Sequence, residues 1–336
     1  MVGSRLLRRR LPQFTDRLVL GDQGLRASPY CLGWVKSAET VHAAFEAGIN
    51  FFFITTDLHW PAYEATRRGV RELLARGPEI RDRMIVAGAC YQAHPTLCYA
   101  PFQELLDDMP GLGRLDVLVA GAVYAVERDR RMPVYEQHRD RGFLSARAIG
   151  MRFHDRSAAL AALQDKRVDI AFIRYNPDHP GAAKDLFPHL PSPLGGKGPG
   201  VRGNKCETLK PPHPWTLSLK GRGGTPAART LLFNFTSTFG HVPPAEMEAL
   251  GLHGSKYWHP EITDHYRFVL SRPEIDGVLL APKTPEELQG VAEALTKGPL
   301  TEEEQAYLMD VALVARGDAN VAPEEQEPAN ERPLWR

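Results

Sequence analysis

The stretch Ala47-Gly-Ile-Asn-Phe-Phe-Phe-Ile-Thr-Thr-Asp-Leu-His-Trp60, which runs on through Pro61-Ala-Tyr-Glu64, decides the fold class of this chain. An alanine-rich helical pattern ends at Gly48, and a run that is apolar except for Asn50 covers 49–54. A short apolar run is typical of a parallel strand that is buried on both faces. Polar and aromatic residues then crowd together before the next helical pattern, 65–75. This order indicates a helix, a strand and a loop at the carboxyl end of the strand, where α/β folds place their chemistry.

The loop after this strand carries the candidate catalytic residues Asp57, His59 and Tyr63, with Trp60 and Glu64 beside them. Imidazole titrates near neutral pH, so His59 can act as a general acid or base, and Asp57 is placed to orient it. We interpret the loop as a working site. The alternative interpretation is that His59 and Trp60 only fill the mouth of the fold.

Length, composition and charge limit the classes of protein to which this chain can belong. A chain of 336 residues with 43% apolar content can bury the core of one large domain. Its 41 basic residues balance 41 acidic ones, so no global field attracts nucleic acid or an anionic membrane. The cysteines form no Cys-x-x-C pair, and no apolar run approaches the roughly 20 residues that span a bilayer. We expect a cytoplasmic protein that acts on a small molecule, without a nucleic-acid or membrane partner.

Strand and helix patterns alternate along the rest of the chain. Further strands are predicted at 28–35, 83–90, 115–119, 146–151, 168–174, 230–235 and 277–280. Helices are predicted at 38–47, 65–75, 101–108, 134–141, 157–163, 181–186, 262–270 and 285–295. Parallel strands joined by helices cross over with one hand, and eight of them close into a barrel. The sequence therefore predicts an α/β fold, a (β/α)8 TIM barrel.

The barrel is predicted to cover 16–316. Residues 1–15 are basic and are expected to form an N-terminal arm, and the hairpin pattern of 18–25 follows them. Ser37 is the expected cap of the first barrel helix, and Thr301 with Glu304 forms a capping box before a last helix. The Pro- and Glu-rich residues 317–336 are predicted to be a flexible tail.

Several motifs, in this order and spacing, resemble the aldo-keto reductases over nearly the whole chain outside 191–225. They are Leu18-x-x-Gly-x-x-Gly-Leu25, Ser28-x-x-x-Leu-Gly33, Ala47-Gly-Ile-Asn-Phe-Phe52, Arg147-Ala-Ile-Gly150, Arg174-Tyr-Asn-Pro177 with Gly181-Ala182, Tyr266-Arg-Phe-Val-Leu-Ser271 and Gly298-Pro-Leu-Thr-Glu-Glu303. The resemblance implies a (β/α)8 barrel that reduces carbonyl compounds with NADPH.

The catalytic residues of that family are replaced. In its Phe-Asp-Thr-Ala-x-x-Tyr-Gly motif the tyrosine donates a proton and the aspartate supports it through a lysine. In the register that keeps Asp57 and Leu58 in place, Ile54 stands at the aspartate and His59 at the tyrosine. The family's lysine falls near Ala89 and its histidine near Gly121. The resemblance therefore implies that His59 replaces the phenol as proton donor and that Asp57 tunes it.

The predicted cofactor site consists of Arg152, Tyr175, Asn176, Lys283 and Thr284. By resemblance, Tyr175 packs on nicotinamide, and Lys283 with Thr284 meets a phosphate at a helix start. Arg152 stands where the family has carboxamide partners, and it could instead bind a substrate carboxylate or phosphate, or pair with a neighbouring acid. We therefore expect NADP(H) to bind, more weakly than to a typical reductase.

Two other classes of function stay open. One is a cofactor-independent or metal-dependent barrel enzyme, a lyase or isomerase that uses His59 and Asp57. The other is a non-catalytic scaffold or regulatory protein. Zinc or iron would accept a mixed set made of His59, Asp57, His94, Cys98 and His154. Their spacing matches no recognised ligand motif, so we assign no metal ligand.

Residues 191–225 look foreign to the barrel. They are rich in Pro, Gly and basic residues and stand where a barrel needs only a short connection. The halves 191–203 and 212–223 can be encoded by complementary DNA strands, so the segment resembles a translated inverted-repeat element of the kind found in bacterial genomes. A basic lid is the alternative, but a segment between a helix and the next strand enters opposite the active-site loops.

We predict that the segment is poorly ordered and dispensable. Replacing 192–224 by a short Gly/Ser linker should leave the melting temperature and ligand binding almost unchanged, because long surface insertions cost little closure entropy. Thermal unfolding of the shortened and full-length proteins measures this. A shortened protein that fails to fold would show that the segment is part of the barrel.

Overall fold

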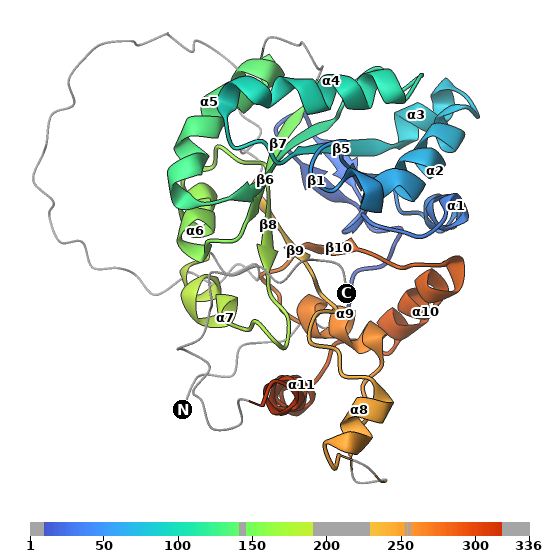
Figure 1. The fold of residues 1–336 in the computed structure, drawn as a ribbon, viewed down its shortest axis with the longest axis vertical. Coiled ribbons are helices and arrows are strands. Elements are labelled where there is room, and N and C mark those ends of the chain that lie inside the picture. Colours follow the sequence, from blue (N-terminus) through green and yellow to red (C-terminus); the bar gives the residue numbers. More distant parts are fainter. Residues whose placement is uncertain (1–9, 141–145, 191–228, 253, 255–256, 318–336) are drawn as a thin grey trace, which may run out of the picture.

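The computed structural model describes residues 10–140, 146–190, 229–252, 254 and 257–317. Eight parallel strands close into a barrel in chain order, surrounded by helices (Figure 1). The strands are β3 (Tyr30–Leu32), β4 (Phe51–Ile54), β5 (Ile85–Cys90), β6 (Val117–Val123), β7 (Ala148–Phe153), β8 (Ile170–Arg174), β9 (Leu231–Phe235) and β10 (Gly277–Leu280). The predicted (β/α)8 barrel is confirmed.

The helices follow the predicted order, with boundaries shifted by a few residues except at α5. They are α1 (Ala38–Glu46), α2 (Glu64–Leu74), α3 (Pro78–Arg83), α4 (Tyr99–Asp108), α5 (Ala125–Asp140), α6 (Arg156–Asp165), α7 (Ala182–Asp185), α8 (Pro244–Ala249), α9 (Ile262–Leu270), α10 (Pro285–Thr296) and α11 (Glu302–Ala315). Helix α5 was predicted to start at 134 but begins at Ala125, with Pro133 in its interior. Short 3-10 turns cover η1 (Trp60–Tyr63), η2 (Pro95–Leu97) and η3 (Phe187–His189). The sequence reasoning missed α3 and α8, which are too short to show a helical period.

The barrel closes where β10 pairs with β3, with Val278 opposite Tyr30. A Cβ atom on Gly277 would lie 2.1 Å from the carbonyl oxygen of Pro29 and 2.6 Å from the ring of Phe233. Both distances are far below van der Waals contact, so this position of β10 requires a glycine.

Aromatic rings fill the barrel interior. The ring of Phe172 lies 5.7 Å from that of Phe53 and 5.8 Å from that of Phe233, both edge-on, which is a favoured arrangement. The antiparallel hairpin of β1 (Leu18–Leu20) and β2 (Leu25–Ala27) packs against the same cluster. The predicted hairpin is therefore present.

The N-terminal boundary differs from the prediction. Leu11 and Phe14 are buried, and the Phe14 ring packs edge-on against Tyr30 at 4.8 Å. The hydroxyl of Tyr30 donates to the carbonyl of Pro12 over 2.6 Å. The barrel thus begins by residue 11 rather than 16, because apolar side chains in the expected arm cover its outer core.

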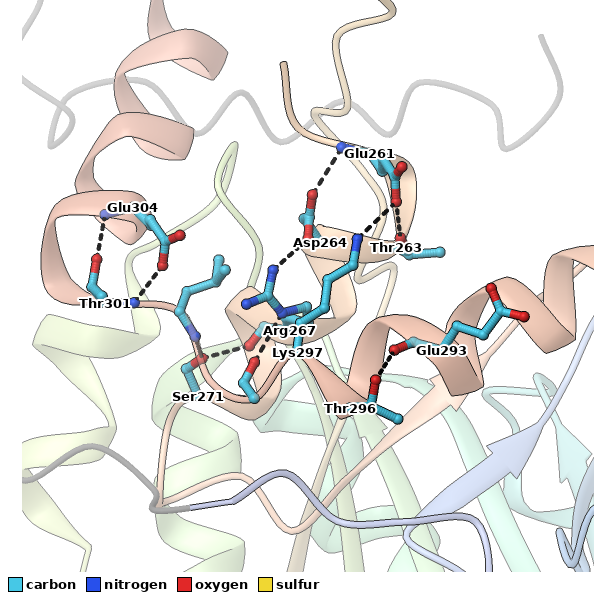
Figure 2. A network of polar contacts seen from close by, with 12 residues as sticks. Glu261, Thr263, Asp264, Arg267, Ser271, Glu293, Thr296, Lys297, Thr301 and Glu304 are labelled. Atoms are coloured by element: carbon cyan, nitrogen blue, oxygen red, sulfur yellow. Dashed lines mark hydrogen bonds and ion pairs between the residues drawn. The ribbon is translucent and has the colours of Figure 1, made fainter. Parts of the chain in front are cut away.

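Polar contacts join α9 to the segments that follow α10 (Figure 2). The buried guanidinium of Arg267 donates to Asp264 over 2.7 Å and to the carbonyl of Gly298 over 2.8 Å. The predicted capping box of Thr301 and Glu304 starts α11. Ser37 stands at the N-cap of α1 but makes no side-chain capping bond, so that expectation was wrong in its chemistry.

The segments 1–9, 191–228 and 318–336 lie outside the described residues, so the predictions for the insertion and the tail stay predictions. Among the described helices, none has the length and apolar character needed to cross a membrane.

A fully buried guanidinium ties the carboxyl ends of two strands to a helix. Arg131 on α5 donates to the carbonyls of Gly121 and Cys90, each over 2.7 Å, and to the hydroxyl of Tyr135 over 3.2 Å. Within the described part of the chain no carboxylate pairs with it. Its role is therefore to satisfy backbone oxygens where β5 and β6 end.

We predict that Arg131→Ala lowers the free energy of unfolding by about 3–5 kcal/mol, because it leaves buried carbonyls without a donor and a cavity beside them. Urea unfolding provides the measurement. Arg130→Ala on an exposed position of the same helix is the control, and it should stay within about 0.5 kcal/mol of wild type. Equal effects of the two changes would contradict this role for Arg131.

Candidate functional site at the barrel mouth

We define the barrel mouth as the carboxyl ends of the eight strands with the residues that follow them. Asp57 and His59 follow β4, Tyr91 follows β5, and Arg152 lies near the end of β7. The ring centroids of His59 and Tyr91 are 4.5 Å apart, and Arg152 reaches the Tyr91 hydroxyl over 3.3 Å. The structure therefore brings residues from three strands together.

Asp57 fixes the loop after β4 to the end of β5. One carboxylate oxygen accepts the hydroxyl of Thr55 over 2.8 Å, and the other accepts the backbone N–H of Tyr91 over 2.5 Å. The ring of His59 packs edge-on, at 86°, against the Tyr91 ring. Asp57 thus positions the residue on which His59 rests.

Tyr91 is a candidate functional residue that the sequence reasoning missed. A Cβ atom on Gly121 would lie 2.4 Å from the Tyr91 ring, so the ring occupies space that only a glycine leaves open. Gly121 stands near the position of the family's catalytic histidine. Two signals were present in the sequence: an aromatic residue directly after a strand, and a glycine in place of a catalytic side chain.

Arg152 also contacts the phenol of Tyr91. Its guanidinium lies 4.2 Å above the centroid of the Phe235 ring, a cation–π arrangement, and Nη1 donates to the Tyr91 hydroxyl. Arg152 is 7% exposed and forms no ion pair with any described residue. The expectation that a neighbouring acid neutralises it does not match this arrangement.

The phenols of the mouth stay protonated at neutral pH. Burial raises the pKa of Tyr91, and the nearby charge of Arg152 only partly opposes that effect. Burial also raises the pKa of Tyr63, which lies in the interior cluster with its ring 5.8 Å from Phe53. Tyr63, expected to be catalytic, is therefore a mostly buried neutral phenol beneath the mouth.

His154 is a neutral imidazole between cations. Burial lowers its pKa to about 3, with further contributions from the charges of Arg152, Arg174 and His59. Nη2 of Arg174 lies 3.2 Å from Nδ1 of His154. Because a guanidinium can only donate, Nδ1 is the acceptor and the imidazole proton sits on Nε2. His154 therefore offers one N–H donor at neutral pH.

Tyr175 does not face the mouth. It is 3% exposed, and its ring stacks on Phe268 of α9 at 5.3 Å, in the layer between barrel and helices. Successive side chains of a strand alternate between faces, so Tyr175 points outward where Arg174 points inward. The expected packing of Tyr175 on nicotinamide is corrected by this finding.

Asn176 and Thr284 are also engaged within the protein. Nδ2 of Asn176 donates to the carbonyl of Thr236 over 2.9 Å, and its Oδ1 accepts the N–H of His179 over 2.8 Å. The Thr284 hydroxyl caps α10 by accepting the N–H of Glu287 over 3.3 Å. These two residues therefore link loops and start a helix.

A carboxylate occupies the helix start where a cofactor phosphate was expected. Oε2 of Glu287 accepts the backbone N–H of Lys283 over 2.7 Å, and Glu286 adds a second negative charge in the first turn. Phosphate would meet repulsion there, so the residues present do not fit NADP(H) in the predicted way.

The mixed set considered for a metal is dispersed. His94 is exposed and bonds to Thr96 over 2.8 Å, and Cys98 is buried with its thiol 3.4 Å from the carbonyl of Gln92. In the described ranges no group of three or more His, Cys, Asp or Glu side chains is arranged to hold a metal ion.

Comparison with known proteins identifies the fold. No protein-family model and no curated protein matches the sequence. An aldo-keto reductase from Bacillus halodurans, in its holo form, superimposes with a TM-score of 0.59 at 12% identity, over 88% of this chain and 96% of its own. A thermostable aldo-keto reductase in complex with the inhibitor epalrestat gives 0.59 and 12%, over 91% and 100%. The chain thus has the aldo-keto reductase type of barrel.

We predict that Gly121→Ala displaces the Tyr91 ring and lowers the free energy of unfolding by about 1–3 kcal/mol, since the added methyl overpacks the mouth. Urea unfolding measures the stability, and a crystal structure shows the ring. Gly290→Ala is the matched control, because its Cβ meets nothing within 4 Å and it lies inside α10. It should stabilise the protein by up to about 1 kcal/mol. An unmoved Tyr91 ring in Gly121→Ala would contradict the stated packing.

Proposed function

We propose that this protein is an enzyme that moves protons to and from a small carbonyl compound at the barrel mouth, without a bound nicotinamide. The observation that carries the proposal is the contact chain His59, Tyr91 and Arg152: an imidazole against a phenol, and the phenol against a cation. A phenol beside a cation is also how the resembled family protonates carbonyl oxygens, but here the phenol follows β5 and the cation stands on β7.

The Tyr91 hydroxyl is suited to hold the carbonyl oxygen of a substrate. Its oxygen accepts a hydrogen bond from Arg152, so its own O–H is available to donate. When a base removes the proton next to the carbonyl, negative charge develops on that oxygen. The Tyr91 donor and the fixed charge of Arg152 would then stabilise the enolate.

His59 is the proposed base in this reaction. It is only partly buried, and its ring lies 4.5 Å from that of Tyr91, on the same side of the mouth. His59 would take the proton from the carbon next to the carbonyl and return it at the same or a neighbouring atom. An enolate formed in this way leads to isomerisation or to the elimination step of a lyase.

Carbonyl reduction with NADP(H) is the second candidate function. The shared fold with a reductase solved in its holo form favours it, and Lys283 still offers a cation near the start of α10. The positions of Tyr175, Asn176, Thr284 and Glu287 count against it. We further propose that the protein acts in the cytoplasm, as its cysteine pattern indicates.

We predict that the enzyme exchanges solvent deuterium into the carbon next to the carbonyl of its substrate. Proton NMR in D2O with a panel of small ketones, aldehydes and 2-oxo acids detects the exchange. Tyr91→Phe and His59→Ala should each slow it by about 10²–10⁴-fold, since each removes a proton-transfer group. Tyr99→Phe and His94→Ala are controls that remove a phenol and an imidazole from exposed positions on α4 and its preceding loop.

Titration with NADPH and NADH separates the two functions. No binding is expected at millimolar concentration. Saturable binding of NADPH, with its oxidation in the presence of a carbonyl compound and loss of both in Lys283→Ala, would replace the proposal by carbonyl reduction. Deuterium exchange that is as fast in Tyr91→Phe and His59→Ala as in wild type would also contradict the proposed proton-transfer function.

A further inference from the structure

Arg152 is a nearly buried cation whose polar atoms are incompletely used. It is 7% exposed, and its Nε has no hydrogen-bond partner. Its one described polar contact is the Tyr91 hydroxyl at 3.3 Å, a neutral acceptor at long range. A buried charge without a counter-charge lowers the free energy of unfolding. A guanidinium in this state at the barrel mouth is therefore suited to bind an anionic ligand.

The other buried arginines among the described residues donate to carboxylates or to backbone carbonyls. Arg81 pairs with Asp116 over 3.0 Å, and Arg267 pairs with Asp264 over 2.7 Å. Arg131 has no carboxylate among the described residues, but it donates to two backbone carbonyls at 2.7 Å. Arg67, the fifth buried arginine of the described residues, pairs with Glu64. Nε lacks a partner in Arg67 and Arg131 as well. Arg152 is thus the one of these five whose described polar contacts include neither a carboxylate nor a backbone carbonyl.

The groups near Arg152 among the described residues supply no carboxylate that pairs with it. His154 presents an N–H rather than a negative charge, and Arg174 lies against it at 3.2 Å. The closest acid on the loop after β4, Asp57, already accepts from Thr55 and from the Tyr91 backbone. Phe235 covers one face of the guanidinium, and a planar guanidinium can form two parallel hydrogen bonds with a carboxylate or a phosphate.

We propose that Arg152 binds an oxyanion group of the substrate, a carboxylate or a phosphate, within the barrel mouth. This inference rests on the proposed function in one respect, which is that the substrate binds at the barrel mouth. It narrows the substrate class to small carbonyl compounds that carry a negative group, with the carbonyl at Tyr91 and the anion at Arg152.

Isothermal calorimetry with inorganic phosphate and with pyruvate, the simplest 2-oxo carboxylate, tests the proposal. The wild-type protein should bind at least one of them with a millimolar dissociation constant. Binding of phosphate alone identifies a phosphate group, and binding of pyruvate alone identifies a carboxylate. Arg152→Met, which keeps the volume of the side chain, should weaken binding at least tenfold. Arg152→Lys, which keeps the charge without the fork, should weaken it less and covers the case in which Arg152→Met does not fold.

Two sets of controls keep this result separate from the enzyme proposal. His59→Ala should bind inorganic phosphate within about twofold of wild type even though it loses deuterium exchange, since the guanidinium of Arg152 contacts Tyr91 and Phe235 rather than His59. Arg76→Gln removes the same charge from the surface, where Arg76 pairs with Glu46 over 2.9 Å, and should bind normally. Absence of binding of both anions to wild type, or undiminished binding to Arg152→Met and Arg152→Lys, would overturn the proposal.

Discussion

The contact between β10 and β3 is the one on which the rest of the molecule depends. It closes the eight strands into a ring, and only a glycine at position 277 allows the strands to approach this closely. A closed parallel barrel brings all its carboxyl ends to one mouth, whatever their distance along the chain. Arg152 and Tyr91 can therefore touch although 61 positions separate them. The side chains at the mouth are not part of this closure, because it depends on the strands beneath them.

The barrel was predictable from the sequence because each buried strand reads as an apolar run between helical patterns. The same rule placed Asp57, His59 and Arg152 at one end of the barrel, since each stands at or after the end of a strand. It did not give the direction of a side chain. Tyr175 was expected at the mouth, but one step along β8 changes the face, and the ring lies among helices.

Local and distant contacts explain the other differences. The role of Thr284 was readable in principle, because Thr284 followed by Glu287 three residues later is the pattern of a helix start. The sequence signals could mark Tyr91 as a candidate but could not give its contacts, because its neighbours Gly121 and Arg152 come from other strands. A sequence motif shows where a residue stands along the chain. The contacts at this mouth join residues from different strands, so a motif does not show them.

The packing of Tyr91 against Gly121 also constrains how such a mouth evolves. A side chain at position 121 and the phenol at position 91 compete for one volume, since even a methyl group at 121 would approach the ring to 2.4 Å. A catalytic histidine at 121 and a catalytic tyrosine at 91 are therefore mutually exclusive. A lineage that moves between these two layouts passes through an intermediate with neither group, and a single reversion at either position restores nothing. Positions 91 and 121 therefore act as one unit, because a larger side chain at either position requires a smaller one at the other.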